Sequence, residues 1–179
     1  MSRLFAKNIS CLFLGVILLL SPVSTCLHAQ VPVTIPKLSV LPGAVVRIPL
    51  TIGDLSGKDV TSFEFVVACD TTVLRLSGVD QEKTLSSGLT MFSNNHVRPY
   101  GPGRMKVVCA SSQPLTGSGV LVYVTGVAQK QNGSSSLQLS NCILNAGTPP
   151  TSVSDGSLTV KPPKGIKSLI RGDSAMTKK

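Results

Sequence analysis

The stretch Thr61–Val79, TSFEFVVACDTTVLRLSGV, contains two β-strand patterns joined by a short turn. In the first pattern the rings of Phe63 and Phe65 alternate with the polar side chains of Ser62 and Glu64, and this period of two buries one face of a strand while the other face meets water. The Asp-Thr-Thr segment breaks the alternation with short side chains that bond nearby backbone, and a second apolar strand pattern follows. The stretch therefore predicts a sheet with one buried face. The expected inward residues are Phe63, Phe65, Val67 and Cys69, and the expected outward residues are Ser62, Glu64, Val66 and Ala68.

Similar strand-length segments fill the chain between residues 31 and 160. Gly, Pro, Asn and Asp turn signals separate them at short intervals, and no segment shows helical periodicity. The expected strands are 33–40, 45–52, 62–69, 73–79, 89–94, 104–111, 120–128, 137–144 and 156–160. Strands without helices must bury their apolar faces against each other, so we expect one all-β domain over residues 31–160, a two-sheet β-sandwich of nine strands. Periodicity alone does not separate a jelly roll from an immunoglobulin-like strand order.

The order of several motifs resembles the cohesin family, the binding modules of cellulosomes and related bacterial surface assemblies. The motifs are FEFVVACD, VLRLSGV, GRMKVVCASS, GSGVLVYVTGVA, SLQLSNCILNAG and DGSLTV, between Val33 and Val160. The chain departs from the family pattern at Cys69, where an aromatic residue is common, and at Thr71 and Thr72, where Asn or Pro is common. The resemblance implies jelly-roll topology and a dockerin-type partner, a small helical module that carries calcium.

The resemblance also implies a docking surface on the solvent face of the sheet that holds strands 62–69, 89–94, 104–111 and 137–144. The family's contact positions fall on two polar residues of the aromatic strand, two serines after the K-V-V-C strand and two residues of a loop. These residues are Ser62, Glu64, Ser111, Ser112, His96 and Tyr100. Hydrogen-bonding side chains around an aromatic anchor are typical of interface centres. An ordinary solvated sheet face is the alternative interpretation.

The first 30 residues have the pattern of an export signal. A basic start precedes an apolar run over residues 11–20, which is shorter than the ~20 residues that cross a bilayer. Cleavage is expected near Ala29 or Gln30. Residues 23–26 loosely resemble a lipobox, so a lipid anchor at Cys26 is an alternative, and only that anchor would attach the protein to a membrane. The pattern predicts bacterial-type export to the periplasm, the cell surface or the medium.

The charge of the chain is concentrated outside the expected domain. The 179 residues carry a formal net charge of +9, but the leader has two basic residues and no acid, and the tail, residues 161–179, has six basic residues and one acid. Residues 31–160 therefore carry +2. Nucleic-acid binding needs a concentrated basic face, with aromatic rings where the strand is single, and the domain shows neither pattern. Pro and Gly at the start of the tail end the last strand, so we expect a flexible basic extension.

Three cysteines, Cys69, Cys109 and Cys142, remain after the leader, an odd number for an oxidising compartment. The alternation turns Cys69 and Cys109 inward, and in cohesin-like order their strands are neighbours. A Cys69–Cys109 disulfide is therefore one expectation, on the condition that the two α-carbons lie within about 7 Å. Three buried apolar thiols are the other. No C-x-x-C pair or histidine cluster accompanies these cysteines, so no metal site is expected.

The sequence shows no pattern of catalytic residues. Once the leader is removed His96 is the single histidine, and it lies in a polar loop without a cysteine or acidic cluster nearby. No two carboxylates can be placed across a cleft as a glycosidase requires, and no Gly-rich phosphate loop precedes a helix. We expect no enzyme activity and no cofactor.

Direct sugar binding is an alternative function. Flat binding to polysaccharide uses several exposed aromatic rings in a row, and the chain has no Trp. Phe63, Phe65 and Tyr123 lie in patterns that face the core, which leaves Tyr100 as the free ring. The sequence favours an exported, non-catalytic, dockerin-binding module in polysaccharide degradation or surface assembly. The other hypotheses are a carbohydrate-binding module that contacts polysaccharide through polar loop groups, and a structural cell-surface protein held by its basic tail.

Overall fold

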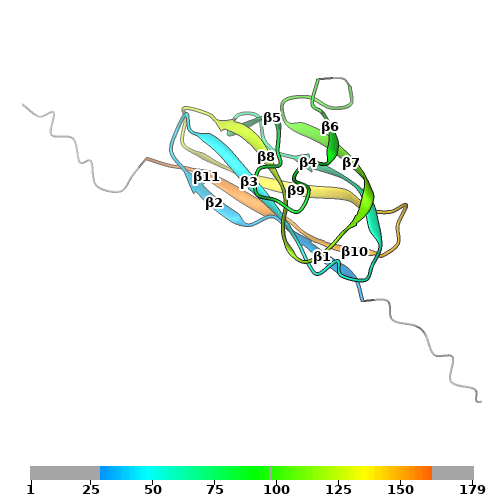
Figure 1. The fold of residues 1–179 in the computed structure, drawn as a ribbon. Helices are drawn as coiled ribbons and strands as arrows, with labels where there is room; N and C mark the ends of the chain where they lie inside the picture. Colours follow the sequence, from blue (N-terminus) through cyan, green and yellow to red (C-terminus); the bar gives the residue numbers. More distant parts are fainter. Residues whose placement is uncertain (1–28, 97, 163–179) are drawn as a thin grey trace, which may run out of the picture.

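The structure, a computed structural model, describes residues 29–96 and 98–162. This part of the chain contains eleven β-strands and no helix (Figure 1). The strands are β1 (Val31–Thr34), β2 (Lys37–Val40), β3 (Val45–Ile52), β4 (Val60–Ala68), β5 (Leu74–Asp80), β6 (Thr90–Asn94), β7 (Arg104–Leu115), β8 (Gly119–Ala128), β9 (Gly133–Leu144), β10 (Thr151–Ser154) and β11 (Gly156–Val160). A five-stranded sheet has the order β10-β1-β3-β8-β5, and a six-stranded sheet has the order β2-β11-β9-β4-β7-β6. The predicted two-sheet β-sandwich is confirmed, whereas the predicted count of nine strands is wrong.

The two additional strands arise where the ends of the domain change sheet. The expected strand 33–40 is broken at Ile35 and Pro36, so that β1 lies in the five-stranded sheet and β2 in the six-stranded sheet. Pro36 has no N–H group with which to continue a ladder. Near the other end, β10 and β11 change sheet at Asp155 and run parallel to β1 and β2. Gly156 permits this crossing, because a Cβ there would lie 2.5 Å from Ile35 Cγ2 and 2.6 Å from the Pro36 carbonyl oxygen.

The core lies between the two sheets and contains the inward side chains predicted for β4. Phe63 and Phe65 are buried, and their rings stack with centroids 6.2 Å apart. Burial of each such side chain contributes about 2–3 kcal/mol to folding. The expectation that Val66 meets water is wrong, since this side chain is only 1% exposed although it alternates with the core residues of β4. Its cross-strand neighbours on the outer face are Lys106 and Ser140.

A bulge in β9 changes which residues of that strand face outward. Leu139 faces the core, so simple alternation would also turn Ile143 inward. Asn141 has a φ of +49°, and the pairing of β9 with β4 shifts register at this point. As a result Leu144 is fully buried and Ile143 faces solvent.

The three cysteines of the described chain, Cys69, Cys109 and Cys142, are free thiols. The antiparallel register places Cys109 opposite Phe63, whereas the backbone N–H of Cys69 bonds to Gly103 at the far end of the same strand pair. At about 3.3 Å per residue the two cysteines are roughly 20 Å apart, far beyond disulfide reach. The expected Cys69–Cys109 disulfide is therefore wrong, because its two strands are neighbours but their register separates the thiols. Burial raises the pKa of Cys69 and of Cys142 to about 11, and the nearby Asp70 carboxylate adds to the effect on Cys69.

Several predictions fall on residues 1–28 and 163–179, which lie outside the described part of the chain. The export signal, the lipid anchor at Cys26 and the flexible basic tail stay predictions. Within the described ranges no helix has the length and apolar character needed to cross a membrane.

Candidate functional site

One row of side chains crosses the outer face of the six-stranded sheet. The register of β6, β7 and β4 pairs Phe92 with Val108 and Val108 with Glu64. Glu64 pairs in turn with Ile143 of β9. Neighbouring strands lie about 4.8 Å apart, so the row spans roughly 14 Å. We call Phe92, Val108, Glu64 and Ile143 the cross-strand row.

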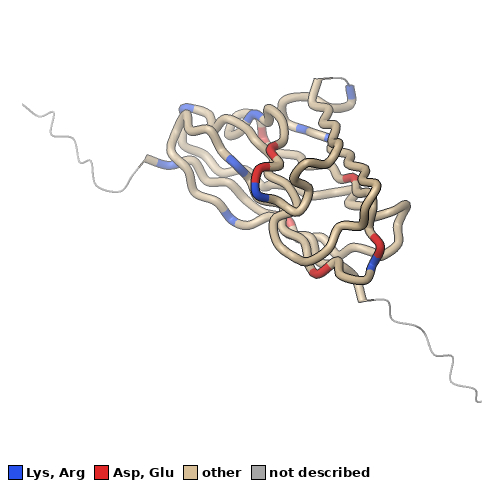
Figure 2. Tube along the Cα trace, viewed as in Figure 1, with Lys and Arg blue, Asp and Glu red and all other residues tan. Residues whose placement is uncertain are grey.

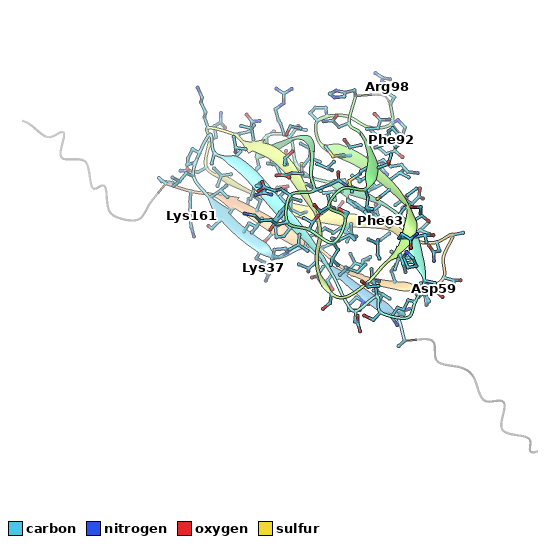
Figure 3. The ribbon with its side chains drawn as sticks, viewed as in Figure 1. Lys37, Asp59, Phe63, Phe92, Arg98 and Lys161 are labelled. Carbon is cyan, nitrogen blue, oxygen red and sulfur yellow. The ribbon has the colours of Figure 1, made fainter. Side chains whose placement is uncertain are left out.

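Three members of the cross-strand row are apolar side chains in contact with solvent. Phe92 is 71% exposed, Val108 38% and Ile143 37%. Phe63 lies between the two sheets, whereas Phe92 lies on the outside of β6 (Figure 3). A group of exposed apolar side chains at adjoining positions is typical of a surface that another molecule covers.

An ion pair holds Glu64, the one charged member of the row. Lys106 Nζ lies 2.8 Å from Glu64 Oε2, and each side chain is about one third exposed. The hydrogen bond that Lys106 donates to Glu64 raises the pKa of Lys106. The pair orients the carboxylate and offsets its charge, so the centre of the row carries polar groups without net charge.

A hollow of about 300 Å³ opens beside the row, where β4 begins and β9 ends. Its wall includes Ser62, Glu64, Val108, Ile143, Asn145 and Ala146. Asn145 Oδ1 accepts hydrogen bonds from the backbone N–H groups of Thr61 (2.9 Å) and Ser62 (3.1 Å), and Nδ2 donates to the Asp59 carbonyl (2.8 Å). Asn145 has a φ of +43°, a conformation that Asn tolerates better than most residues. This side chain therefore fixes the backbone at the entrance of β4.

Four of the six predicted contact residues lie on two neighbouring strands of the six-stranded sheet, β4 and β7. Ser62 and Glu64 are on β4, and Ser62 pairs with Ala110 of β7. Ser111 and Ser112 follow Ala110 in a segment of β7 where the pairing with β4 skips several residues. The two serines therefore lie at the same end of the face as Ser62.

The other two predicted contact residues, both in the loop between β6 and β7, lie apart. Tyr100 is half-buried, and the guanidinium carbon of Arg104 lies 5.9 Å from the centre of its ring. Arg104 is exposed at the start of β7, so Tyr100 borders the outer face. His96 instead lines a second hollow together with Arg75 of β5 and Gln129, which follows β8. The structure thus places His96 away from the surface to which the resemblance assigned it.

Sequence reasoning missed the apolar members of the row and Asn145. The alternation that turns Val107 and Cys109 inward already points Val108 outward, and this signal was present in the sequence. Phe92 has the same kind of signal, because it alternates with Met91, which packs against the core. Ile143 had no such signal, since the bulge in β9 reverses its direction.

The expectation that Tyr123 faces the core is also wrong. Its ring is half-buried on the outer side of the five-stranded sheet, where the guanidinium carbon of Arg47 lies 4.2 Å from the ring centre. Arg47 also forms a 2.8 Å ion pair with Asp80. A tyrosine favours such a position because its ring covers neighbouring side chains while its hydroxyl reaches water.

Charged residues are scattered over the described part of the molecule (Figure 2). In residues 29–96 and 98–162 no three His, Cys, Asp or Glu side chains lie together in a way that could hold a metal ion. The outer face of the six-stranded sheet offers apolar contact and oriented hydrogen-bonding groups, and this is the chemistry of a protein interface.

Comparisons with known proteins agree with this architecture. The sequence model of the family described as "Cohesin domain" matches residues 31–160. No curated protein matches the chain. Among solved structures, a non-cellulosomal cohesin from the hyperthermophilic archaeon Archaeoglobus fulgidus is 18% identical, with a TM-score of 0.60 over 75% of this chain and 93% of that one. The sixth cohesin of scaffoldin B from Acetivibrio cellulolyticus, solved in complex with a Cel5 dockerin, is 16% identical, with a TM-score of 0.62 over 74% of this chain and 100% of that one. A cohesin from Clostridium thermocellum, solved in a type I cohesin–dockerin complex, is 13% identical, with a TM-score of 0.60 over 74% and 94% of the two chains. At these identities the likeness to solved structures shows the fold.

Proposed function

The chain belongs to the cohesin family, a family of non-catalytic protein-interaction modules, and we propose that it binds a dockerin-type protein through the outer face of its six-stranded sheet. Two of the three solved structures described above are cohesins in complex with dockerins. We assign binding to this face because of the cross-strand row, which combines three exposed apolar side chains with one oriented carboxylate.

The composition of the row suits a protein partner. Apolar side chains from three strands can be covered together, and their burial would supply most of the binding free energy. Glu64, Lys106 and the polar groups around the hollow can then fix the orientation of the partner by hydrogen bonds. We therefore expect Phe92 and Ile143, at the two ends of the row, to be the apolar anchors.

The rim of the face near the loop between β6 and β7 is basic. Arg104 and Arg98 are exposed, and among the described residues neither forms a salt bridge with an acidic side chain. Such unpaired charges accelerate association with a partner of opposite charge, and salt screens the effect. We expect the partner to present acidic residues here and its association rate to fall as ionic strength rises.

The biological setting follows from the leader as an expectation. The export signal predicted in residues 1–30 would direct the module to the cell surface, the periplasm or the medium. There it would hold dockerin-bearing proteins such as polysaccharide-degrading enzymes. Calcium would belong to the dockerin partner. The module itself would contribute a rigid sheet face.

Titration of a calcium-loaded dockerin module from the same organism against the protein tests the proposal. Glu64→Arg removes the ion pair and places two cations side by side in the middle of the face, and we expect the affinity to fall by about 30-fold or more. Val45→Arg is the matched control, because Val45 is a 77% exposed strand residue in the five-stranded sheet. Unchanged affinity in Glu64→Arg would exclude this face as the binding surface. Failure of every dockerin module of the organism to bind would exclude the function itself.

A further inference from the structure

A second and larger hollow lies between β5 and the loop that joins β6 to β7. Its volume is about 570 Å³, within the range of about 300–1,000 Å³ that is usual for small-molecule sites. Its lining includes Arg75, Ser77, His96, Val127 and Gln129, and no member of the cross-strand row contributes to it. The hollow is therefore a surface separate from the proposed docking face.

Three polar side chains of this hollow are available to a ligand. Within the described residues, the guanidinium of Arg75, the imidazole of His96 and the side-chain amide of Gln129 form no hydrogen bond or ion pair. Arg75 is exposed and no carboxylate lines the hollow. An unpaired guanidinium presents a planar set of donors that matches a carboxylate group. The hollow thus offers one anion-binding group flanked by donors and acceptors.

The walls of the hollow argue against an extended peptide as the ligand. A peptide usually adds to a sheet edge through main-chain hydrogen bonds. Here the edge of β5 is already used at Leu76, whose N–H donates to the Pro102 carbonyl (2.7 Å) and whose carbonyl accepts from Asn95 Nδ2 (3.0 Å). A ligand must therefore be recognised by side chains, in an open hollow with an apolar floor.

The apolar floor is formed by Pro102 and Val127, because the side chain of Leu76 is only 3% exposed and packs in the core. A pyranose ring has apolar C–H faces and hydroxyl groups at its edge, so its faces can rest on such a floor while hydroxyls bond to the amide of Gln129. The hydroxyl of Ser77, which shares a 3.2 Å hydrogen bond with Thr125 Oγ1, has further capacity for a sugar hydroxyl. We propose that this hollow binds a carboxylate-bearing saccharide, a uronic acid unit of an acidic polysaccharide, with Arg75 paired to the carboxylate. The proposal goes beyond dockerin binding, since it gives the same module direct contact with a glycan on another surface.

Isothermal titration of the full chain with tetragalacturonate tests the proposal. The fully methyl-esterified tetramer, which lacks the charges, and tetraglutamate, which has the charges without the sugar, are the comparison ligands. We expect tetragalacturonate to bind and the other two to bind at least about tenfold more weakly. Arg75→Gln should weaken tetragalacturonate binding about tenfold or more, because it removes a charge-assisted pair. Lys37→Gln, at an exposed cation on the edge strand β2 of the six-stranded sheet, is the matched control and should leave binding unchanged.

Three results would overturn the proposal: no binding of tetragalacturonate at millimolar concentration, equal binding by Arg75→Gln and the unaltered chain, or tetraglutamate binding as tight as that of the sugar. Thermal unfolding followed by circular dichroism verifies that each variant is folded. Dockerin titration of Arg75→Gln keeps the two functions distinct, since the loss of sugar binding with intact dockerin binding would assign the hollow to the sugar alone.

Discussion

Replacement of Phe92 by alanine separates the binding role of the cross-strand row from the stability of the fold. Phe92 is 71% exposed, so a partner can cover roughly 140 Å² of a side chain that presents about 200 Å². At about 25 cal/mol per Å² this area corresponds to ~3.5 kcal/mol, which is an upper bound because ordering of the interface opposes it. We expect a loss of about 2 kcal/mol in the free energy of binding, or about 30-fold in Kd. The free energy of unfolding should change by less than about 0.5 kcal/mol, because the ring lies outside the core.

Calorimetric titration with the dockerin partner and chemical denaturation of the free protein measure the two quantities. Val45→Ala is the control, since it removes an even more exposed apolar side chain (77%) from a strand of the other sheet. A Kd of the Phe92→Ala variant within a factor of two of the Kd of the unaltered chain would refute the binding role of the row. A large loss of stability would instead show that Phe92 belongs to the fold.

Four further predictions concern the fold. Gly156→Ala should lower the free energy of unfolding by about 2–3 kcal/mol in urea denaturation, because its Cβ would lie 2.6 Å from a backbone carbonyl of the Ile35–Pro36 crossing; wild-type stability would contradict the close approach. Asn145→Ala should cost about 2 kcal/mol in the same assay and weaken dockerin binding, since it leaves two N–H groups at the start of β4 without their acceptor, and an unaltered melting temperature would show that these bonds are dispensable. Cys69 and Cys142 should react slowly with iodoacetamide in the folded protein at pH 8, because their raised pKa of about 11 keeps the thiols neutral, and reaction at the rate of a free cysteine would contradict their burial. The same two pKa values predict how stability depends on pH. The contribution of the two buried, neutral thiols to the free energy of unfolding is fully present below the ordinary cysteine pKa of 9.0 and is lost as the pH rises through about 11.

The alternation of Phe63 and Phe65 with Ser62 and Glu64 was enough to predict a two-layer β fold, because a period of two assigns each side chain to a face without knowledge of its neighbours. Glu64 was placed on the outer face by the same argument. The sequence could not show where a strand leaves one sheet for the other. That change depends on the contact of Gly156 with the Ile35–Pro36 segment, which lies far away in the chain.

Register and bulges account for the remaining failures. The predicted Cys69–Cys109 disulfide required only adjacent strands, but the antiparallel register separates the two thiols by most of the strand length. Ile143 faces solvent because the bulge at Asn141 reverses the alternation of side chains along β9. No local residue pattern predicted that bulge. His96 shows the same limit in a loop, since its direction depends on how the loop packs against β5.

The most direct test of the central claim is an NMR titration of the isotope-labelled protein with its dockerin partner. The account predicts that the largest chemical-shift changes occur at the backbone amides of Glu64, Phe92, Val108 and Ile143, all on the six-stranded sheet. Changes centred on Val45 and Val127 of the five-stranded sheet, with the cross-strand row unaffected, would contradict it.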